Sequence, residues 1–148
     1  MKGIKKTADL YVGMKGLTTV MDLAKFKTVD KAWGQEIWLV NNERYCAKLL
    51  HINAGWQCSL HMHPIKKETF IVLDGGVGLE IITAKHDGMI SLPLTFENHP
   101  LAAGDSITLE PNTFHRFWSY TDEPAVVLEI SSTHSDEDVV RLENSRPL

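Results

Sequence analysis

The chemically most informative stretch of this sequence runs from Gly55 to Gly75 and brings two histidines and a glutamate close together. Residues i and i+2 of a β-strand point to the same face, so His61 and His63 send both imidazoles to one side. Glu68 begins the next predicted strand after a short turn and can fold back beside them. Two imidazoles and a carboxylate from neighbouring strands are typical of a site for a divalent transition metal.

A further metal ligand is available in His115, which lies in a predicted strand after Pro111. An isolated His-x-His occurs often by chance, so its spacing alone leaves a surface or core pair as an alternative. Cys58 stands at an odd offset from His61, which turns it to the opposite face of the strand, and we expect it to be a small buried hydrophobe. The remaining histidines have no such companions and are expected to be structural or solvated: His51, His86, His99 and His134.

The elements that must position these side chains are almost all strands. Alternating residues bounded by Gly, Pro and Asn predict strands at 36–40, 45–52, 68–74, 77–83, 106–110, 114–120 and 125–131. Gly75 and Gly76 predict a hairpin between two of them, because glycine adopts positive φ freely. Residues 84–100 are expected to form a longer hairpin with an irregular connection. About eight short strands of this kind predict a sandwich or a small barrel.

Two other segments are predicted at the ends of the chain. Residues 1–34 are weakly patterned and are expected to form an N-terminal arm, which leaves 35–148 as one barrel domain. Residues 135–143 are predicted as a short C-terminal helix, with Ser135 as its N-cap. Acidic residues follow directly in the first turn, where the helix dipole favours negative charge.

The composition fits one soluble globular domain and excludes several classes of partner. Of 148 residues, 43% are hydrophobic and 23% are charged, and the net charge of −4 gives no basic surplus for nucleic acid or an anionic membrane. No apolar run approaches the roughly 20 residues that span a bilayer. Because no secretory signal is visible and the 2 cysteines make no disulfide framework, we expect a cytoplasmic protein with reduced thiols.

The spacing of these residues resembles the first motif of the cupin superfamily, matched at Gly55, His61, His63, Glu68 and Gly75. The second motif matches at Gly104, Asp105 and His115, and departs from the family at Pro111, Thr113 and Ser119. The resemblance implies an all-β fold, a single-domain cupin with a jelly-roll barrel (double-stranded β-helix). It also implies one divalent metal ion per chain, manganese or zinc with iron(II) as an alternative. The implied ligands are His61, His63, Glu68 and His115.

A narrower resemblance is to the D-lyxose ketol-isomerases, cupins that interconvert aldoses and ketoses. It is carried by residues 44–48, 67–70, 111–115 and 129–133, and the chain lacks the longer inserts of that family. Trp33-Gly34 and the stretch from Pro111 also resemble cupin-type mannose-6-phosphate isomerases. The substrate implied is therefore a small-molecule sugar, a pentose or hexose, or a sugar phosphate.

Aldose–ketose isomerisation through a cis-enediol needs a Lewis acid and an acid/base pair. In the resembled isomerases the proton transfers are carried by the lysine two residues before the metal glutamate and by a late-strand glutamate, which implies Lys66 and Glu129 as catalytic residues here. Two alternatives remain open at this point. Lys66 can be a solvated lysine, and Glu129 can form a structural ion pair with Arg116 or Lys48. Arg116 follows His115 directly and is expected to face away from the metal.

The leading interpretation is a metal-dependent sugar isomerase. Three histidines and a glutamate on a cupin barrel also serve iron(II) oxygenases, and a non-catalytic sugar-binding module is a third alternative. A homodimer is expected, with the N-terminal arm crossing onto a partner to cover an exposed sheet edge.

Overall fold

The computed structural model describes residues 25–82 and 95–148, whose regular elements are 13 β-strands in two sheets. The six strands of the first sheet lie in the order β1, β2, β3, β11, β6, β9. Their bounds are β1 (Lys27–Lys31), β2 (Gly34–Asn41), β3 (Cys46–Ile52), β11 (Ala125–Ser131), β6 (Glu68–Asp74) and β9 (Ser106–Leu109). All neighbouring pairs in this sheet are antiparallel.

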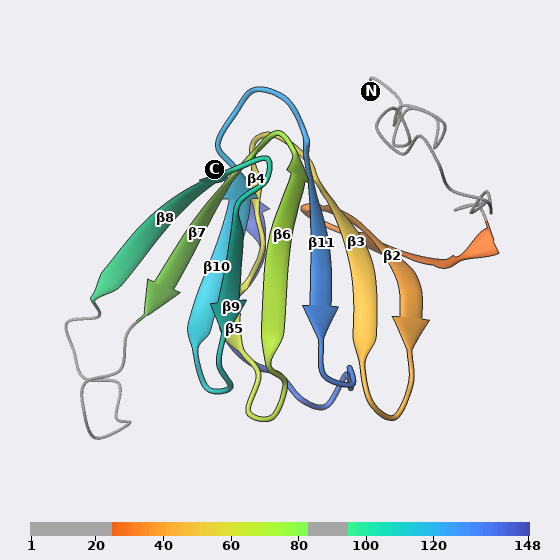
Figure 1. Ribbon diagram of the computed structural model, residues 1–148. Helices are drawn as coiled ribbons and strands as arrows, with labels where there is room; N and C mark the ends of the chain where they lie inside the picture. The colour runs from red at the N-terminus through yellow and green to blue at the C-terminus, as the bar shows by residue number, and fades with distance from the viewer. Residues whose placement is uncertain (1–24, 83–94) are drawn as a thin grey trace.

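The second sheet has seven strands and centres on β10. Its bounds are β12 (Val140–Glu143), β5 (Leu60–Met62), β10 (Phe114–Ser119), β4 (Trp56–Gln57), β13 (Arg146–Pro147), β7 (Gly76–Ile82) and β8 (Phe96–Ala102). The two short strands β4 and β5 both pair with β10, and β7 pairs with β10 on one side and β8 on the other. Of the C-terminal strands, β12 pairs with β5 and β13 pairs with β4. Figure 1 shows the two sheets curving around a shared interior.

Strand alternation decides which side chains fill this interior. On β11, Ala125 and Val127 belong to the main core cluster, whereas Val126 belongs to a separate cluster on the other face of the sheet. The inward row of β11 continues with Glu129, which is 5% exposed. On β3 the inward row likewise continues from apolar residues to Lys48, which is 2% exposed. The barrel interior is therefore apolar at one end and lined by charged groups at the other.

The all-β prediction is confirmed, and the seven strands predicted between residues 36 and 131 are present to within two residues at each end. The predicted glycine hairpin joins β6 to β7, and Gly75 takes the positive φ of 75° that the turn requires. The longer hairpin is also present, since β7 and β8 pair along their whole length. Most of its connection lies outside the described residues.

The predicted C-terminal helix over 135–143 is wrong. The Ser135 cap does form, since its hydroxyl accepts a hydrogen bond from the Glu137 amide at 3.3 Å, but the chain makes a single turn. Residues Val140–Glu143 instead form β12 and pair with β5, where they satisfy the backbone groups of a strand edge. Local helix signals are a weak preference, and this tertiary pairing overrides them.

The predicted arm over 1–34 lies partly within the described residues. Its described end contains β1, which pairs with β2 in the first sheet, so the sheet reaches back beyond the predicted domain boundary at residue 35. Residues 1–24 lie outside the described ranges. In the described part of the chain, no helix has the length and apolar character needed to cross a membrane.

Candidate active site

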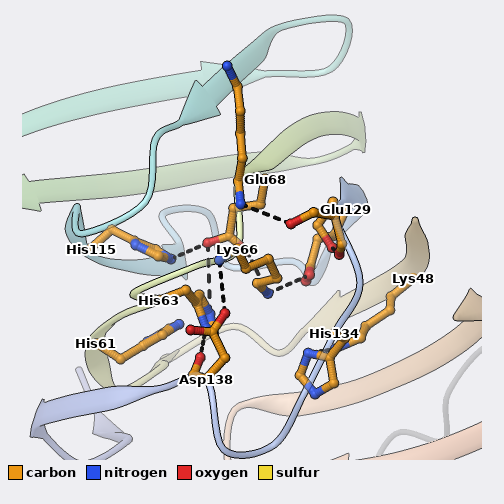
Figure 2. A network of polar contacts seen from close by, with 12 residues as sticks. Lys48, His61, His63, Lys66, Glu68, His115, Glu129, His134 and Asp138 are labelled. Carbon is orange, nitrogen blue, oxygen red and sulfur yellow. Dashed lines mark hydrogen bonds and ion pairs between the residues drawn. The ribbon is translucent and has the colours of Figure 1, made fainter. Parts of the chain in front are cut away.

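Three imidazoles gather at the polar end of the barrel. His61 on β5 and His115 on β10 are cross-strand partners, and His63 follows directly after β5. The ring centroid of His61 lies 4.5 Å from that of His115 and 5.1 Å from that of His63. Figure 2 shows these histidines converging on Glu68 and Lys66. The structure therefore brings together the side chains that the His-x-His spacing and the late histidine predicted.

Each of the three rings is oriented by a hydrogen bond from Nδ1 to a backbone carbonyl. His61 Nδ1 lies 2.8 Å from the Ser59 oxygen, and His115 Nδ1 lies 2.9 Å from the Thr113 oxygen. His63 Nδ1 contacts the carbonyl of Asp138. Because a carbonyl only accepts, Nδ1 carries the proton of each neutral ring and Nε2 keeps its lone pair. This tautomer is the one in which histidine binds a metal through Nε2.

Glu68, at the start of β6, is the anionic centre of the cluster. Its Oε1 lies 3.0 Å from His115 Nε2 and 4.0 Å from His63 Nε2, and its Oε2 lies 2.8 Å from Lys66 Nζ. His115 Nε2 is buried without a hydrogen-bond partner among the described residues. In this tautomer it is an acceptor, and the nearest Glu68 oxygen, Oε1, is an acceptor too, so no hydrogen bond forms between them. A cation between a lone pair and a carboxylate resolves that conflict.

The titratable groups of the cluster stand in the protonation states that suit a metal site. Burial, with His115 nearby, holds the pKa of His61 well below its usual value. Burial and Lys66 lower the pKa of His63 in the same way. Burial alone would raise the pKa of Glu68, but the ammonium of Lys66, 2.8 Å from its Oε2, helps to lower that pKa and keep the carboxylate ionised. Neutral imidazoles and an ionised carboxylate are the forms that ligate metals.

The donor set fits a divalent ion, although the side chains do not form a finished metal centre. In the ranges 25–82 and 95–148, no group of three or more His, Cys, Asp or Glu side chains already has the geometry to hold a metal. Two ligand atoms at right angles, each about 2.1 Å from one ion, lie about 3 Å apart. The separation of His115 Nε2 and Glu68 Oε1 is 3.0 Å, so this pair has the spacing of two adjacent ligands.

Lys66 and Glu129 form a buried ion pair beside the histidines. Lys66 Nζ donates to Glu129 Oε1 at 3.0 Å, and only 4% of Lys66 is exposed. Burial lowers the pKa of Lys66, but Glu129 and Glu68 raise it by more, which keeps the ammonium charged. The alternative of a solvated Lys66 is therefore wrong. The predicted pair lies in contact, and Lys66 bridges Glu129 to Glu68.

The other partners considered for Glu129 are occupied elsewhere. Arg116 donates to Glu80 and Glu143, away from the histidines, as its place after His115 predicted. Lys48 Nζ lies 3.4 Å from a carboxylate oxygen of Glu36.

Cys58 is a buried thiol, as predicted. It belongs to the main core cluster, and its Sγ accepts a hydrogen bond from the Phe117 amide at 3.1 Å. Burial raises the pKa of the Cys58 thiol to about 12, so it stays protonated and is no metal ligand. Cys46 is also buried and free, so neither cysteine forms a disulfide.

Asp138 is the site residue that sequence reasoning missed. Its carboxylate accepts hydrogen bonds of 2.9 Å from the backbone amides of Ile65 and Lys66, while its own carbonyl accepts from His63. Figure 2 shows it beneath Lys66 and His63. The only local signal was an acidic residue in a stretch that resembles a helix start, which gave no indication of this contact.

The cluster opens into a cavity of about 180 Å³. His61, His63, Lys66, Glu68 and Glu129 line one part of it. Another part is lined by Glu36, Lys48 and His134, together with residues of the C-terminal segment. A small polar molecule can therefore reach both the histidine cluster and a second group of charged side chains.

Comparison with known proteins places this chain in a family. The family model described as "Cupin domain" matches residues 48–131, which hold all six predicted site residues. The chain belongs to the cupin family. The resemblance inferred from the two motifs is thereby confirmed, as is the cupin fold, apart from the C-terminal helix.

Several curated relatives carry the names of sugar isomerases. The chain is 35% identical to the D-lyxose/D-mannose isomerase of Thermosediminibacter oceani over 113 residues, covering 67% of this chain and 61% of that protein. It is 29% identical to the D-lyxose ketol-isomerase of Cohnella laeviribosi, covering 89% of this chain and 84% of that protein. The chain thus spans less than two thirds of the first relative's length.

Solved cupin structures support the fold. An oxalate decarboxylase of Bacillus subtilis superposes with a TM-score of 0.66 at 19% identity, covering 81% of this chain and 31% of that protein. At this identity the likeness concerns the barrel alone.

Proposed function

We propose that this cupin is a metal-dependent aldose–ketose isomerase that acts on a sugar of the D-lyxose or D-mannose type. The observation that carries the proposal is the buried Lys66, whose ammonium contacts Glu129 at 3.0 Å and Glu68 at 2.8 Å beside the three histidines. A charged donor and a carboxylate acceptor stand next to each other, which is the pair that a proton shuttle between two carbons requires. The names of the curated relatives support the same reaction.

The residues that would hold the metal are His61, His63, Glu68 and His115. Their nitrogen and carboxylate donors suit manganese or zinc, and iron(II) is an alternative. When bound, the ion supplies a Lewis acid that stabilises negative charge on a sugar oxygen.

In the proposed mechanism the chain's own residues move the protons. The carboxylate of Glu129 takes the proton from one of the two reacting carbons and returns it to the other. The ammonium of Lys66 gives a proton to the carbonyl oxygen as the carbon proton leaves, which forms the cis-enediol. The resulting amine then takes the proton of the neighbouring hydroxyl as that carbon becomes the new carbonyl, so Lys66 ends as an ammonium again. Burial of both side chains excludes water from the pair, which strengthens these interactions.

The buried charges of the cavity support an unphosphorylated sugar, and the exposed Arg141 on its lining keeps the mannose 6-phosphate type as the alternative that the assay decides. The buried cations that line it already face carboxylates, because Lys48 contacts Glu36, and Lys66 contacts Glu68 and Glu129. A phosphate group needs positive charge that is not already neutralised.

The homodimer predicted from the sequence remains a proposal. The outer face of the first sheet supports it, because Ile37, Leu49 and Val126 form an apolar cluster there, and Ile130 on the same face of β11 is 43% exposed. A second copy covering this face would remove apolar surface from water. Sedimentation showing only monomer at micromolar concentration would contradict it.

A cytoplasmic location likewise stays a prediction, in keeping with two free buried thiols.

The proposed function is tested by assaying isomerisation before chelation, after it, and after adding back manganese, zinc or iron(II). The sugars are D-lyxose, D-mannose, D-fructose, D-xylulose and mannose 6-phosphate. We expect metal-restored conversion of free sugars that both Glu129→Gln and Lys66→Ala abolish. Metal binding without conversion of any sugar would overturn the isomerase, and oxygen uptake with iron(II) would then identify an oxygenase. Sugar binding without either reaction would indicate a non-catalytic module.

A further inference from the structure

A second group of charged side chains lines the same cavity, centred on Lys48. Lys48 Nζ lies 3.4 Å from Glu36 Oε2 and 3.2 Å from His134 Nδ1. The nitrogen also lies 4.3 Å from the centroid of the Trp38 ring. His134 Nε2 in turn lies 3.1 Å from Asp136 Oδ1. We name Glu36, Lys48, His134 and Asp136 the distal cluster.

The hydrogen bonds of the distal cluster fix which atoms donate. An ammonium only donates and a carboxylate only accepts, so His134 accepts at Nδ1 from Lys48 and donates from Nε2–H to Asp136. Burial, together with Lys48, lowers the pKa of His134 and keeps the ring neutral. Lys48 has three N–H donors, and hydrogen bonds to Glu36 and His134 use two of them. In the described ranges Lys48 Nζ makes no third hydrogen bond, and it also faces the Trp38 ring.

The distal cluster lies one strand away from the proposed acid/base pair. Lys48 on β3 and Glu129 on β11 are direct cross-strand partners, and both point into the barrel. Neighbouring strands are about 4.8 Å apart. Figure 2 shows Lys48 on the side of Glu129 away from His115, with His134 at the end of the Lys48 side chain. A molecule of five or six carbons that reacts between Glu129 and Lys66 therefore reaches the distal cluster with its other end.

Packing gives no reason for a charge at this position. The neighbouring inward residues of β3 are Leu50, which belongs to the main core cluster, and Cys46, a buried uncharged thiol, so burial at this row does not itself require a charge. A buried ion pair is weak evidence for stability, because removing two charges from water offsets much of their attraction. A buried, hydrogen-bonded charge on a cavity wall is more typical of a group that contacts a ligand.

We propose that the distal cluster binds the hydroxyl groups at the end of the sugar remote from the reacting carbons, with Lys48 as the donor that determines specificity. This inference rests on the proposed function. The ligand chemistry is that of a neutral polyol rather than a phosphate, because Glu36 neutralises Lys48 and the carboxylate of Asp136 stands next to His134. A hydroxyl both donates and accepts, so it matches a cluster that offers an ammonium beside a carboxylate.

The test combines removal of the Lys48 ammonium with removal of one hydroxyl group of the sugar. Wild type and Lys48→Met are assayed with D-lyxose and with its 4-deoxy and 5-deoxy analogues. Lys27→Met is the matched control, because Lys27 Nζ lies 4.1 Å from the centroid of the same Trp38 ring but is exposed and does not line the cavity. Differences in ring form between the sugars cancel, because every variant meets the same compounds.

We expect wild type and Lys27→Met to favour D-lyxose over at least one deoxy analogue by about tenfold or more in kcat/KM, the value of one hydrogen bond to a charged group. In Lys48→Met this preference should fall to within about twofold, mainly through KM for D-lyxose. A Lys48→Met enzyme that keeps the wild-type preference would overturn the proposal. Should Lys48→Met fail to fold, His134→Asn carries the same test, because it removes the partner that orients the ammonium.

Binding of D-arabinitol, the pentitol obtained by reducing D-lyxose, separates this inference from the proposed function. D-arabinitol cannot isomerise, so calorimetric titration measures its affinity for the cavity without any contribution from the reaction. Binding that weakens about tenfold in Lys48→Met but not in Lys27→Met supports the distal cluster even if no sugar is converted. Equal affinity in all three proteins, or no binding to wild type, would overturn it.

Discussion

The carboxylate of Asp138 accepts a 2.9 Å hydrogen bond from the backbone amide of Lys66, although the two residues lie 72 positions apart. The same carboxylate holds the Ile65 amide, and the Asp138 carbonyl receives Nδ1 of His63. One residue of the C-terminal segment thus fixes both a proposed metal ligand and the backbone of the proposed proton donor. Because β12 follows directly, pairing of this strand with β5 holds Asp138 in place.

Replacing Asp138 by Ala should therefore impair the site more than the fold. The buried amide of Lys66 and the partly buried amide of Ile65 lose their acceptor, which costs about 1–3 kcal/mol of unfolding free energy. We expect metal affinity to fall about 10–100-fold, as for other residues that orient ligands, with a parallel loss of kcat. Metal titration and steady-state kinetics measure both, and Glu137→Ala, an exposed neighbour, is the control. Wild-type metal affinity in Asp138→Ala would refute this role.

Removing the ammonium of Lys66 should destabilise the protein strongly. In Lys66→Met the carboxylates of Glu68 and Glu129 lose their shared cation, and breaking a buried pair costs about 3–5 kcal/mol. In the double variant Lys66→Met/Glu129→Gln only one carboxylate stays ionised, so we expect partial recovery of stability without recovery of turnover. Urea unfolding of the two single variants and the double variant measures the coupling. Strictly additive losses would show that the two side chains do not interact.

Metal binding should stabilise the fold as well as support turnover. An ion that binds only the folded chain raises its unfolding free energy by about 2.7 kcal/mol at a hundredfold excess over Kd. We expect chelation to lower Tm and manganese or zinc to restore it. In His115→Gln the metal should have little effect on Tm, whereas His99→Gln, changed at a half-buried histidine of β8, should respond like wild type. If none of the metals tested changes the Tm of the wild-type protein, that result would argue against a metal site at these residues.

Stability should also fall with pH below about 6.5, in part because of His51. Burial lowers the pKa of His51 below the value of 6.5 that it has when unfolded. Between the folded pKa and 6.5 the unfolded chain binds more protons, so the stabilisation is complete above 6.5 and is lost as pH falls. Urea unfolding from pH 5 to 8 with chelator present should give a shallower slope for His51→Gln. His99→Gln is the control, and an unchanged slope in His51→Gln would exclude this contribution.

The sequence by itself determined the strands and the residues that could carry the chemistry. A strand repeats every two residues, so His61-x-His63 and the inward row ending in Glu129 follow from local backbone geometry. Glycine at position 75 likewise fixes a turn through its own conformational freedom. These features depend on neighbours in the chain, which is why the cupin motifs could be recognised without coordinates.

Only the tertiary structure decided which distant residues meet. The pairing of β12 with β5, which replaced the predicted helix, and the contact of Asp138 with Lys66 depend on how two remote segments align. The distal cluster has the same origin, because Lys48 meets His134 across 86 positions, and the stretch 44–48 gives no indication of that contact. Such contacts are selected by backbone hydrogen bonding and burial over the whole barrel, and no local pattern encodes them.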